Sequence, residues 1–193
     1  NGIGDIFVRD RCVSNGAIVP GCAATTERIS VATAGAEATG PSSFDTNPGS
    51  GWTSISADGR YVAFHSQASN LGFANVDGGH HQYVRDRLAG TTEPVDVGPS
   101  GEEPPYGGGP PRPTVSADGR YVVFGSDAAL LFNGGGGRGS HRVYVRDRWR
   151  GLTEHIAESG NEVHAMSSNG RFVLVAPQAP LVAADINGRH DIY

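Results

Sequence analysis

Residues 56–64 read Ser-Ala-Asp-Gly-Arg-Tyr-Val-Ala-Phe, and residues 116–124 repeat them almost unchanged as Ser-Ala-Asp-Gly-Arg-Tyr-Val-Val-Phe. A looser third copy, Ser-Ser-Asn-Gly-Arg-Phe-Val-Leu-Val, stands at residues 167–175. The period is therefore about 50–60 residues, which is typical of solenoids, propellers and similar arrays. In such arrays each unit is one supersecondary element that buries its faces only against its neighbours.

The centre of each copy predicts a tight β-hairpin. Asp-Gly or Asn-Gly stands between two β-rich runs in all three copies, at residues 58–59, 118–119 and 169–170. This pair is the strongest short hairpin signal, because both residues tolerate the positive φ that a type I′ turn requires. The repeated unit is therefore built from antiparallel strands.

A second repeated block completes the unit. Tyr-Val-Arg-Asp-Arg occurs at residues 83–87 and 144–148, and Phe-Val-Arg-Asp-Arg at 7–11. In the second unit we expect an inner strand ending at Ser56, followed by strands over 61–66, 82–86 and 91–97. Four such strands make one propeller blade.

The predicted fold class is all-β, with blades of four antiparallel strands in an open or incomplete array of about three blades. We divide the chain into four parts. These are the third and outer strands of a first blade at 1–35, a second blade at 36–97, a third blade at 98–157 and an incomplete fourth blade at 158–193.

Composition agrees with many short strands joined by turns and disfavours two classes of partner. The chain has 29 Gly and 12 Pro, and its net charge is -5. Nucleic-acid binders usually gather excess positive charge, so nucleic acid is not an expected partner. No stretch approaches the roughly 20 apolar residues of a membrane-spanning helix, so we expect no transmembrane segment.

The order of these motifs resembles the TolB-like β-propeller repeat. The resemblance rests on the Ser-Ala-Asp-Gly-Arg-Tyr block, then Ser-x-Ala-Ser-Asn-Leu at residues 66–71, then a Gly-rich loop and Tyr-Val-Arg-Asp-Arg. It implies a secreted or periplasmic bacterial protein whose blades present loops to a partner. Similar blades also gate the active site of prolyl-oligopeptidase-like hydrolases, so the propeller of such an enzyme is the alternative. Propellers host unrelated functions.

The two ends of the sequence match each other. Residues 187–193, Asn-Gly-Arg-His-Asp-Ile-Tyr, correspond to residues 1–7, Asn-Gly-Ile-Gly-Asp-Ile-Phe. We expect a fragment of a longer chain or a subunit of a larger assembly, with a protein partner covering the open blade edges. A head-to-tail homo-oligomer that closes a six-bladed ring is a further alternative.

Cys12 and Cys22 flank an insertion between the third and outer strands of the first blade. An even pair in a Gly- and Pro-containing loop, without accompanying His ligands, favours a disulfide over a metal site or two free thiols. A disulfide predicts an oxidising compartment, here the periplasm or the extracellular space.

Asp185, Asn187 and Asp191 surround Gly188 with oxygen-bearing side chains, as calcium loops do, and form the candidate metal site. The equivalent loop at 75–81 replaces the last Asp by His81, so a plain Asx turn competes with this interpretation. No other cofactor is expected.

No catalytic residue is predicted. The chain lacks a Gly-x-Ser-x-Gly motif and any Lys of a phosphate loop. Asp10, Asp86 and Asp147 occupy one repeated position, which favours a structural turn role with their Arg neighbours pairing locally. His80 and His81 point opposite ways in an extended chain. Most of the other histidines are expected at the surface or in turns, and residues 98–113 are expected to form a long exposed loop.

Overall fold

A computed structural model describes residues 2–42, 53–75, 78–98, 100–104, 113–127, 142–158 and 162–176, together with residues 182 and 192. These residues form strands β1 to β14 and no helix, so they include no helix able to cross a membrane. The predicted all-β fold class is confirmed.

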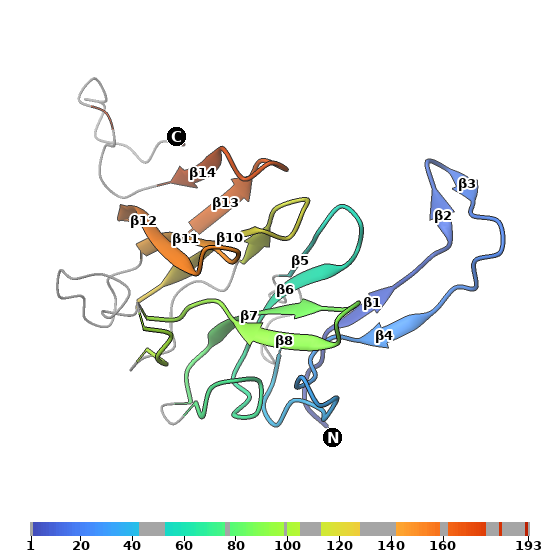
Figure 1. The fold of residues 1–193 in the computed structure, drawn as a ribbon, viewed down its shortest axis with the longest axis horizontal. Coiled ribbons are helices and arrows are strands. Elements are labelled where there is room, and N and C mark those ends of the chain that lie inside the picture. The colour runs from blue at the N-terminus through green and yellow to red at the C-terminus, as the bar shows by residue number, and fades with distance from the viewer. Residues whose placement is uncertain are drawn as a thin grey trace.

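Two four-stranded antiparallel sheets form the centre of the molecule, and we call them blade 2 and blade 3 (Figure 1). Blade 2 contains β5 (Ser54–Ile55), β6 (Tyr61–Ser66), β7 (His81–Asp86) and β8 (Thr91–Pro94). Blade 3 contains β9 (Thr114–Val115), β10 (Tyr121–Ser126), β11 (Arg142–Asp147) and β12 (Leu152–Glu158). Each blade follows chain order, as a propeller blade does.

A two-stranded sheet flanks the centre on each side. Blade 1 pairs β1 (Phe7–Arg9) with β4 (Thr26–Arg28), and blade 4 pairs β13 (Glu162–Met166) with β14 (Val173–Ala176). Between β1 and β4 the chain forms a ribbon of β2 (Val13–Ser14) and β3 (Ala17–Ile18), which projects from the body (Figure 1).

The repeated turn differs from the predicted type I′ geometry. Only the glycine of each pair has a positive φ, +74° at Gly59 and +75° at Gly119, whereas Asp58 and Asp118 do not. The Gly59 N–H donates to the Ser56 carbonyl, and the Ser56 N–H donates to the Tyr61 carbonyl. The type I′ prediction was wrong because the Asp side chain binds its own turn. Both residues have positive φ instead at Asn15-Gly16, the tip of the ribbon.

Apolar side chains fill the space between successive blades. The blade 1–2 core includes Ile29, Phe64 and Tyr83. The other two cores lie between blades 2 and 3, around Val84 and Phe124, and between blades 3 and 4. Backbone hydrogen bonds also join successive turns, from the Ala57 N–H to the Ala117 carbonyl and from the Ala117 N–H to the Ser168 carbonyl. The blades therefore stack through one repeated interface.

Candidate functional site

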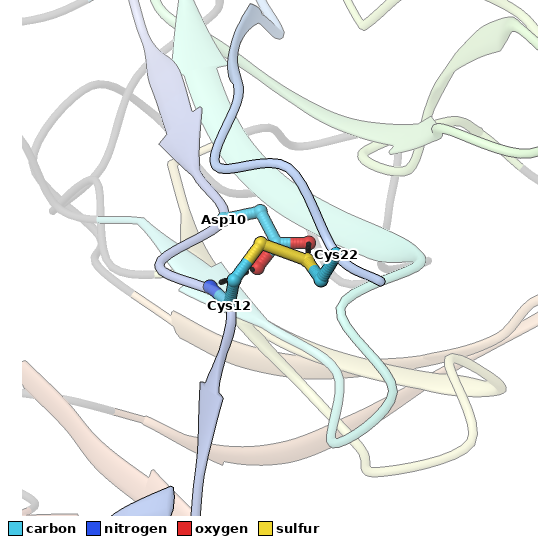
Figure 2. A group of neighbouring side chains, drawn as sticks. All are labelled: Asp10, Cys12 and Cys22. Carbon is cyan, nitrogen blue, oxygen red and sulfur yellow. Dashed lines mark hydrogen bonds between the residues drawn. A yellow bond between two sulfur atoms is a disulfide. The ribbon is translucent and has the colours of Figure 1, made fainter. Parts of the chain in front are cut away.

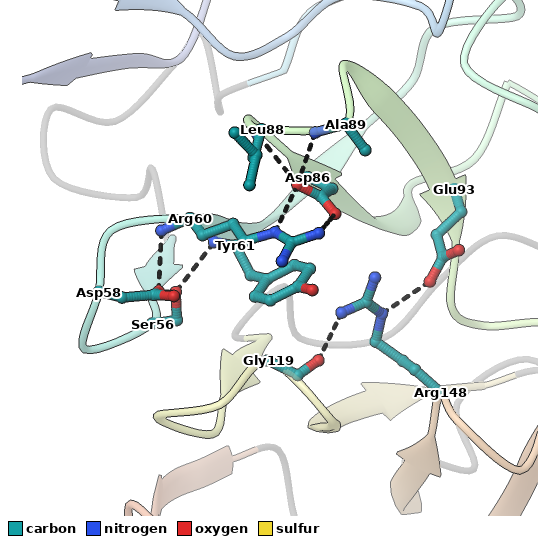
Figure 3. A network of polar contacts seen from close by, with 10 residues as sticks. All are labelled: Ser56, Asp58, Arg60, Tyr61, Asp86, Leu88, Ala89, Glu93, Gly119 and Arg148. Carbon is teal, nitrogen blue, oxygen red and sulfur yellow. Dashed lines mark hydrogen bonds and ion pairs between the residues drawn. The ribbon is translucent and has the colours of Figure 1, made fainter.

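The repeated sequence builds a polar network at one end of blade 2, shown in Figure 3, and again at the same end of blade 3. The Ser56 hydroxyl donates to the Asp58 carboxylate over 2.6 Å, and the same carboxylate accepts the Arg60 N–H over 3.0 Å. Arg60 then makes a bidentate pair with Asp86 on the next strand, at 2.9 and 2.7 Å. Arg120 and Asp147 repeat this pair in blade 3. Hydrogen bonds to charged groups of this kind fix the hairpin to its neighbour.

The third-strand aspartates are structural, as predicted. Asp86 accepts the N–H groups of Leu88 and Ala89, and so holds the turn that follows it. The prediction that the neighbouring arginines pair locally holds for Arg85, which donates to the Gly90 carbonyl and the Thr92 hydroxyl. It does not hold for Arg87, which pairs with Glu27 of blade 1 over 2.8 Å. The ion-pair partner of Asp86 is Arg60.

This network predicts loss of stability in acid. The hydrogen bonds from Arg60 lower the pKa of Asp86 from 3.8 to about 2. The stabilisation is therefore complete above pH 4 and is lost as the pH falls towards 2. For Asp86 we expect a loss of roughly 1–2 kcal/mol, since water screens the partly exposed Arg60. Thermal unfolding at pH 5 and pH 2.5 should show this loss in the wild type and a smaller one in Asp86→Asn. An unchanged pH dependence in the variant would contradict the assignment.

An aromatic ring locks blade 2 onto blade 3. Tyr61 lies over Gly119, where an added Cβ would overlap the ring. The guanidinium carbons of Arg60 and Arg148 lie 4.8 and 4.7 Å from the ring centroid. Arg148 also donates to the Gly119 carbonyl and, over 2.6 Å, to Glu93 (Figure 3). Tyr121 covers Gly170 in the same way one blade further on.

The corresponding position between blades 1 and 2 is an open slot. Arg87 donates to the Gly59 carbonyl over 2.7 Å and to Glu27 over 2.8 Å, as Arg148 does to Gly119 and Glu93. Among the described residues, however, no aromatic ring covers Gly59. A cavity of about 460 Å³ lies there instead, lined by Glu27, Asp58, Gly59, Arg60, Arg87 and Leu88. We call it the Gly59 slot.

A groove of about 610 Å³ continues from the slot along β1. One wall is β1 and the ribbon, including Val8 and Val13, and the other is the Ile55–Gly59 turn. Between blades 2 and 3 the corresponding space lies between β7 and β9. There β6 occupies it, since β6 pairs with β7 and contacts β9. Within the described part of the chain β1 pairs only with β4, whereas β7 pairs with both β6 and β8. The groove therefore lies along a β-strand edge.

That edge has hydrogen-bonding capacity. Ile6 and Asp10 bond to the strand containing β4, through the Ile29 N–H to the Ile6 carbonyl and the Asp10 N–H to the Thr25 carbonyl. In an antiparallel strand the groups of alternate residues point to opposite edges. Phe7 and Arg9 consequently direct their backbone groups towards the groove. Phe7 is 54% exposed, whereas its repeat counterpart Tyr83 is fully buried against Phe64.

The ribbon that borders the groove is closed by a disulfide between Cys12 and Cys22, as predicted (Figure 2). The Asp10 carboxylate accepts the Cys12 N–H over 2.8 Å and lies 3.8 Å from the Cys22 sulfur. These three side chains are close enough to surround one ion. The sulfurs are joined to each other, however, and a thiolate is the form that binds metal. The geometry therefore favours a covalent staple.

The predicted calcium residues Asp185, Asn187 and Asp191 lie outside the described residues. In the equivalent loop the Asn75 side chain donates to the carbonyls of Gln67 and Gly79, at 2.6 and 3.0 Å. Asn75 thus satisfies the backbone of its own loop, which matches the Asx-turn interpretation there.

The described residues contain a buried His-carboxylate pair at the opposite end of blade 2. His81 Nδ1 lies 3.0 Å from Asp96, and both side chains are almost completely buried. Glu103 approaches His81 Nε2 at 3.6 Å, so this described residue of the 98–113 segment contacts the blade, whereas an exposed loop was predicted. His65 is also fully buried, and so is an exception to the expectation that most of the other histidines lie at the surface or in turns. His80 packs against His65, with the ring centroids 5.4 Å apart.

Sequence reasoning missed the Gly59 slot and the His81–Asp96 pair. The sequence did carry a signal for the slot. Arg-Tyr or Arg-Phe follows the glycine in every copy of the repeat, although a hairpin turn requires neither residue. In the sequence, Arg142 and Ala157 of blade 3 align with His81 and Asp96, so no repeated His or Asp marked the pair. A register shift in blade 3 places Glu158 opposite Arg142.

No protein-family model matches this chain, and no curated protein matches it. Among solved structures it is similar to the β-propeller domain of the Trilobed protease from Pyrococcus furiosus, a domain with an open velcro topology. The identity is 12% and the TM-score 0.42, over 65% of this chain and 33% of that chain. No match supports the narrower TolB-like resemblance.

Proposed function

We propose that this protein is an extracytoplasmic β-propeller scaffold that binds a protein segment by strand addition along β1. The incoming segment pairs with Phe7 and Arg9, and places an aromatic side chain in the Gly59 slot. Strand addition of this kind combines main-chain hydrogen bonds, which supply affinity, with a side-chain pocket, which supplies specificity. The Cys12–Cys22 disulfide supports an oxidising location.

The observation that carries the proposal is the incomplete lock at Gly59. Arg87 and Glu27 hold the same arrangement around Gly59 that Arg148 and Glu93 hold around Gly119. In the second case the arrangement receives Tyr61, which is stacked by arginine on two sides. A cavity of that shape suits an aromatic ring on an extended strand, and such cation–π contacts are favourable.

The proposal favours binding over catalysis. Among the described residues, His81 and Asp96 form the pair that most resembles the acid–base pair of an active site. Their side chains are 0% and 2% exposed. A substrate in solution cannot reach it without opening the blade. The groove along β1, by contrast, is open and lined by backbone and arginine groups suited to holding a peptide.

A peptide with the sequence of residues 59–64, acetylated and amidated, tests strand addition. We expect it to bind and to shift the backbone amide NMR signals of Phe7 and Arg9. Replacing its tyrosine by alanine should weaken binding by roughly tenfold or more, since aromatic anchors dominate such interfaces. Replacing its single valine by proline should do the same, because proline removes an N–H that faces Arg9. Equal binding by all three peptides, or shifts elsewhere only, would refute the proposal.

A further inference from the structure

We infer that the first part of the connection from β8 to β9 is a pH-sensitive clasp, closed while His81 carries a proton on both ring nitrogens and open when it loses one. The clasp consists of Gly98 and residues 100–104. The groups that hold it belong to blade 2 and its own loops, and none of them lines the groove along β1. The inference therefore does not depend on the strand-addition proposal.

The clasp is a compact turn with hydrogen bonds of its own. The Gly98 N–H donates to the Glu102 carbonyl and the Gly101 N–H to the Gly98 carbonyl, both over 2.9 Å. The Glu102 carboxylate accepts the Ser100 N–H over 2.8 Å. It also lies so close over Gly98 that an added Cβ would overlap it. Because these contacts are internal, the turn keeps its shape without contact to the blade.

Glu103 holds the clasp on blade 2 through two contacts. One carboxylate oxygen accepts the Ala74 N–H over 3.1 Å, and the other lies 3.6 Å from His81 Nε2. On the other side of the ring, His81 Nδ1 lies 3.0 Å from Asp96. Carboxylates thus face both ring nitrogens. Only the imidazolium has an N–H on each nitrogen, so only this form donates towards both carboxylates.

Burial decides which carboxylate gives way when His81 becomes neutral. The Asp96 side chain is 2% exposed, so it keeps the one remaining N–H, because without a donor it would be an unpaired buried charge. Nε2 then presents a lone pair to Glu103. The Glu103 side chain is 23% exposed and reaches water by a small outward movement. Loss of the proton therefore releases Glu103, and the clasp with it.

The described titratable groups around His81 come from three elements. β7 contributes His80 and Tyr83, the chain after β8 contributes Asp96, and the clasp contributes Glu103. Burial and then the charge of His81 lower the pKa of His80, so the positive charge falls on His81 and not on His80. Burial, followed by the charges of Asp96 and Glu103, raises the pKa of Tyr83, so its hydroxyl stays neutral. Burial raises the pKa of Asp96, and the hydrogen bond from His81 opposes that rise.

A pH titration of the full chain by NMR tests the clasp. The ring nitrogens of His81 report its charge, and the amide proton of Ala74 reports the contact with Glu103. Between about pH 5 and 9 the Ala74 signal should move upfield, with the same midpoint as the His81 signals, because its N–H loses a charged acceptor. The amide signal of Val123 on β10 should not follow this midpoint, which separates opening of the clasp from unfolding.

Glu103→Gln and Glu102→Gln are the matched pair of variants. The amide of Glu103→Gln donates to neutral His81 and its oxygen accepts the Ala74 N–H, so the Ala74 signal should stay constant across the His81 transition. Glu102→Gln changes the neighbouring carboxylate, which binds Ser100, and should keep the wild-type transition. A constant Ala74 signal in the wild type, or the same Ala74 transition in Glu103→Gln, would overturn the inference. So would a His81 ring that keeps one charge state over the whole range.

Discussion

Gly119→Ala is expected to destabilise the protein by about 2–5 kcal/mol, one of the two largest single-residue effects that we anticipate. Two costs add at this position. The φ of +75° is strained for any residue with a Cβ, and the new methyl group would overlap the Tyr61 ring. The ring cannot turn aside easily, because Arg60 and Arg148 stack on it. Urea denaturation followed by circular dichroism measures the loss.

Gly59→Ala is the matched control for this effect. Gly59 occupies the same turn position with a φ of +74°, but the nearest atoms to an added Cβ are Arg87 Nη1 at 3.6 Å and Ile55 Cδ1 at 3.9 Å. This variant should lose only the backbone component, about 1–2 kcal/mol. Equal losses of unfolding free energy in Gly119→Ala and Gly59→Ala would show that the Tyr61 ring moves aside without cost. Tyr61 would then not hold the two blades together.

The contrast between these two glycines also shows what sequence could predict. The strands, the hairpins and the disulfide follow from local signals, namely alternation, Asp-Gly pairs and two cysteines in one loop. Strand β6 has the predicted bounds, Tyr61–Ser66, while the outer strand β8 ends at Pro94 and not at Val97. Local signals identify elements better than they identify ends, because tertiary contacts decide where pairing stops.

The site could not be predicted in the same way, because its partners come from different blades. Arg87 is 60 residues from Glu27 and 28 residues from Gly59, and only strand register brings the three together. The sequence predicted only local pairing for the arginines of this block, since closeness along the chain was the only proximity that it could use. The prediction of a type I′ turn was wrong for a related reason. Ser56 and Arg60 both bind the Asp58 side chain, and a type I′ turn would not arrange them so.

The second large effect is expected from His81→Leu, which should destabilise the protein by roughly 3–5 kcal/mol at neutral pH. The pair of His81 with Asp96 is buried among apolar neighbours, and the Phe73 ring centroid lies 4.8 Å from that of His81. Removing His81 leaves a carboxylate with 2% exposure and without this cationic or hydrogen-bonding partner. An isolated buried charge costs more than the pair contributed. Thermal or urea unfolding at pH 7 measures the loss.

The pH dependence of the variant separates charge from packing. Burial raises the pKa of Asp96, and the hydrogen bond from His81 opposes that rise. Without His81 the folded pKa moves further above the unfolded value of 3.8, so the protonated variant is stabilised relative to the ionised one. His81→Leu should therefore lose less stability at pH 4 than at pH 7. The double variant His81→Leu, Asp96→Leu should recover most of the loss at pH 7, because no buried charge remains. If the loss is instead the same at both pH values and persists in the double variant, His81 acts through its packing against Phe73 and not through Asp96.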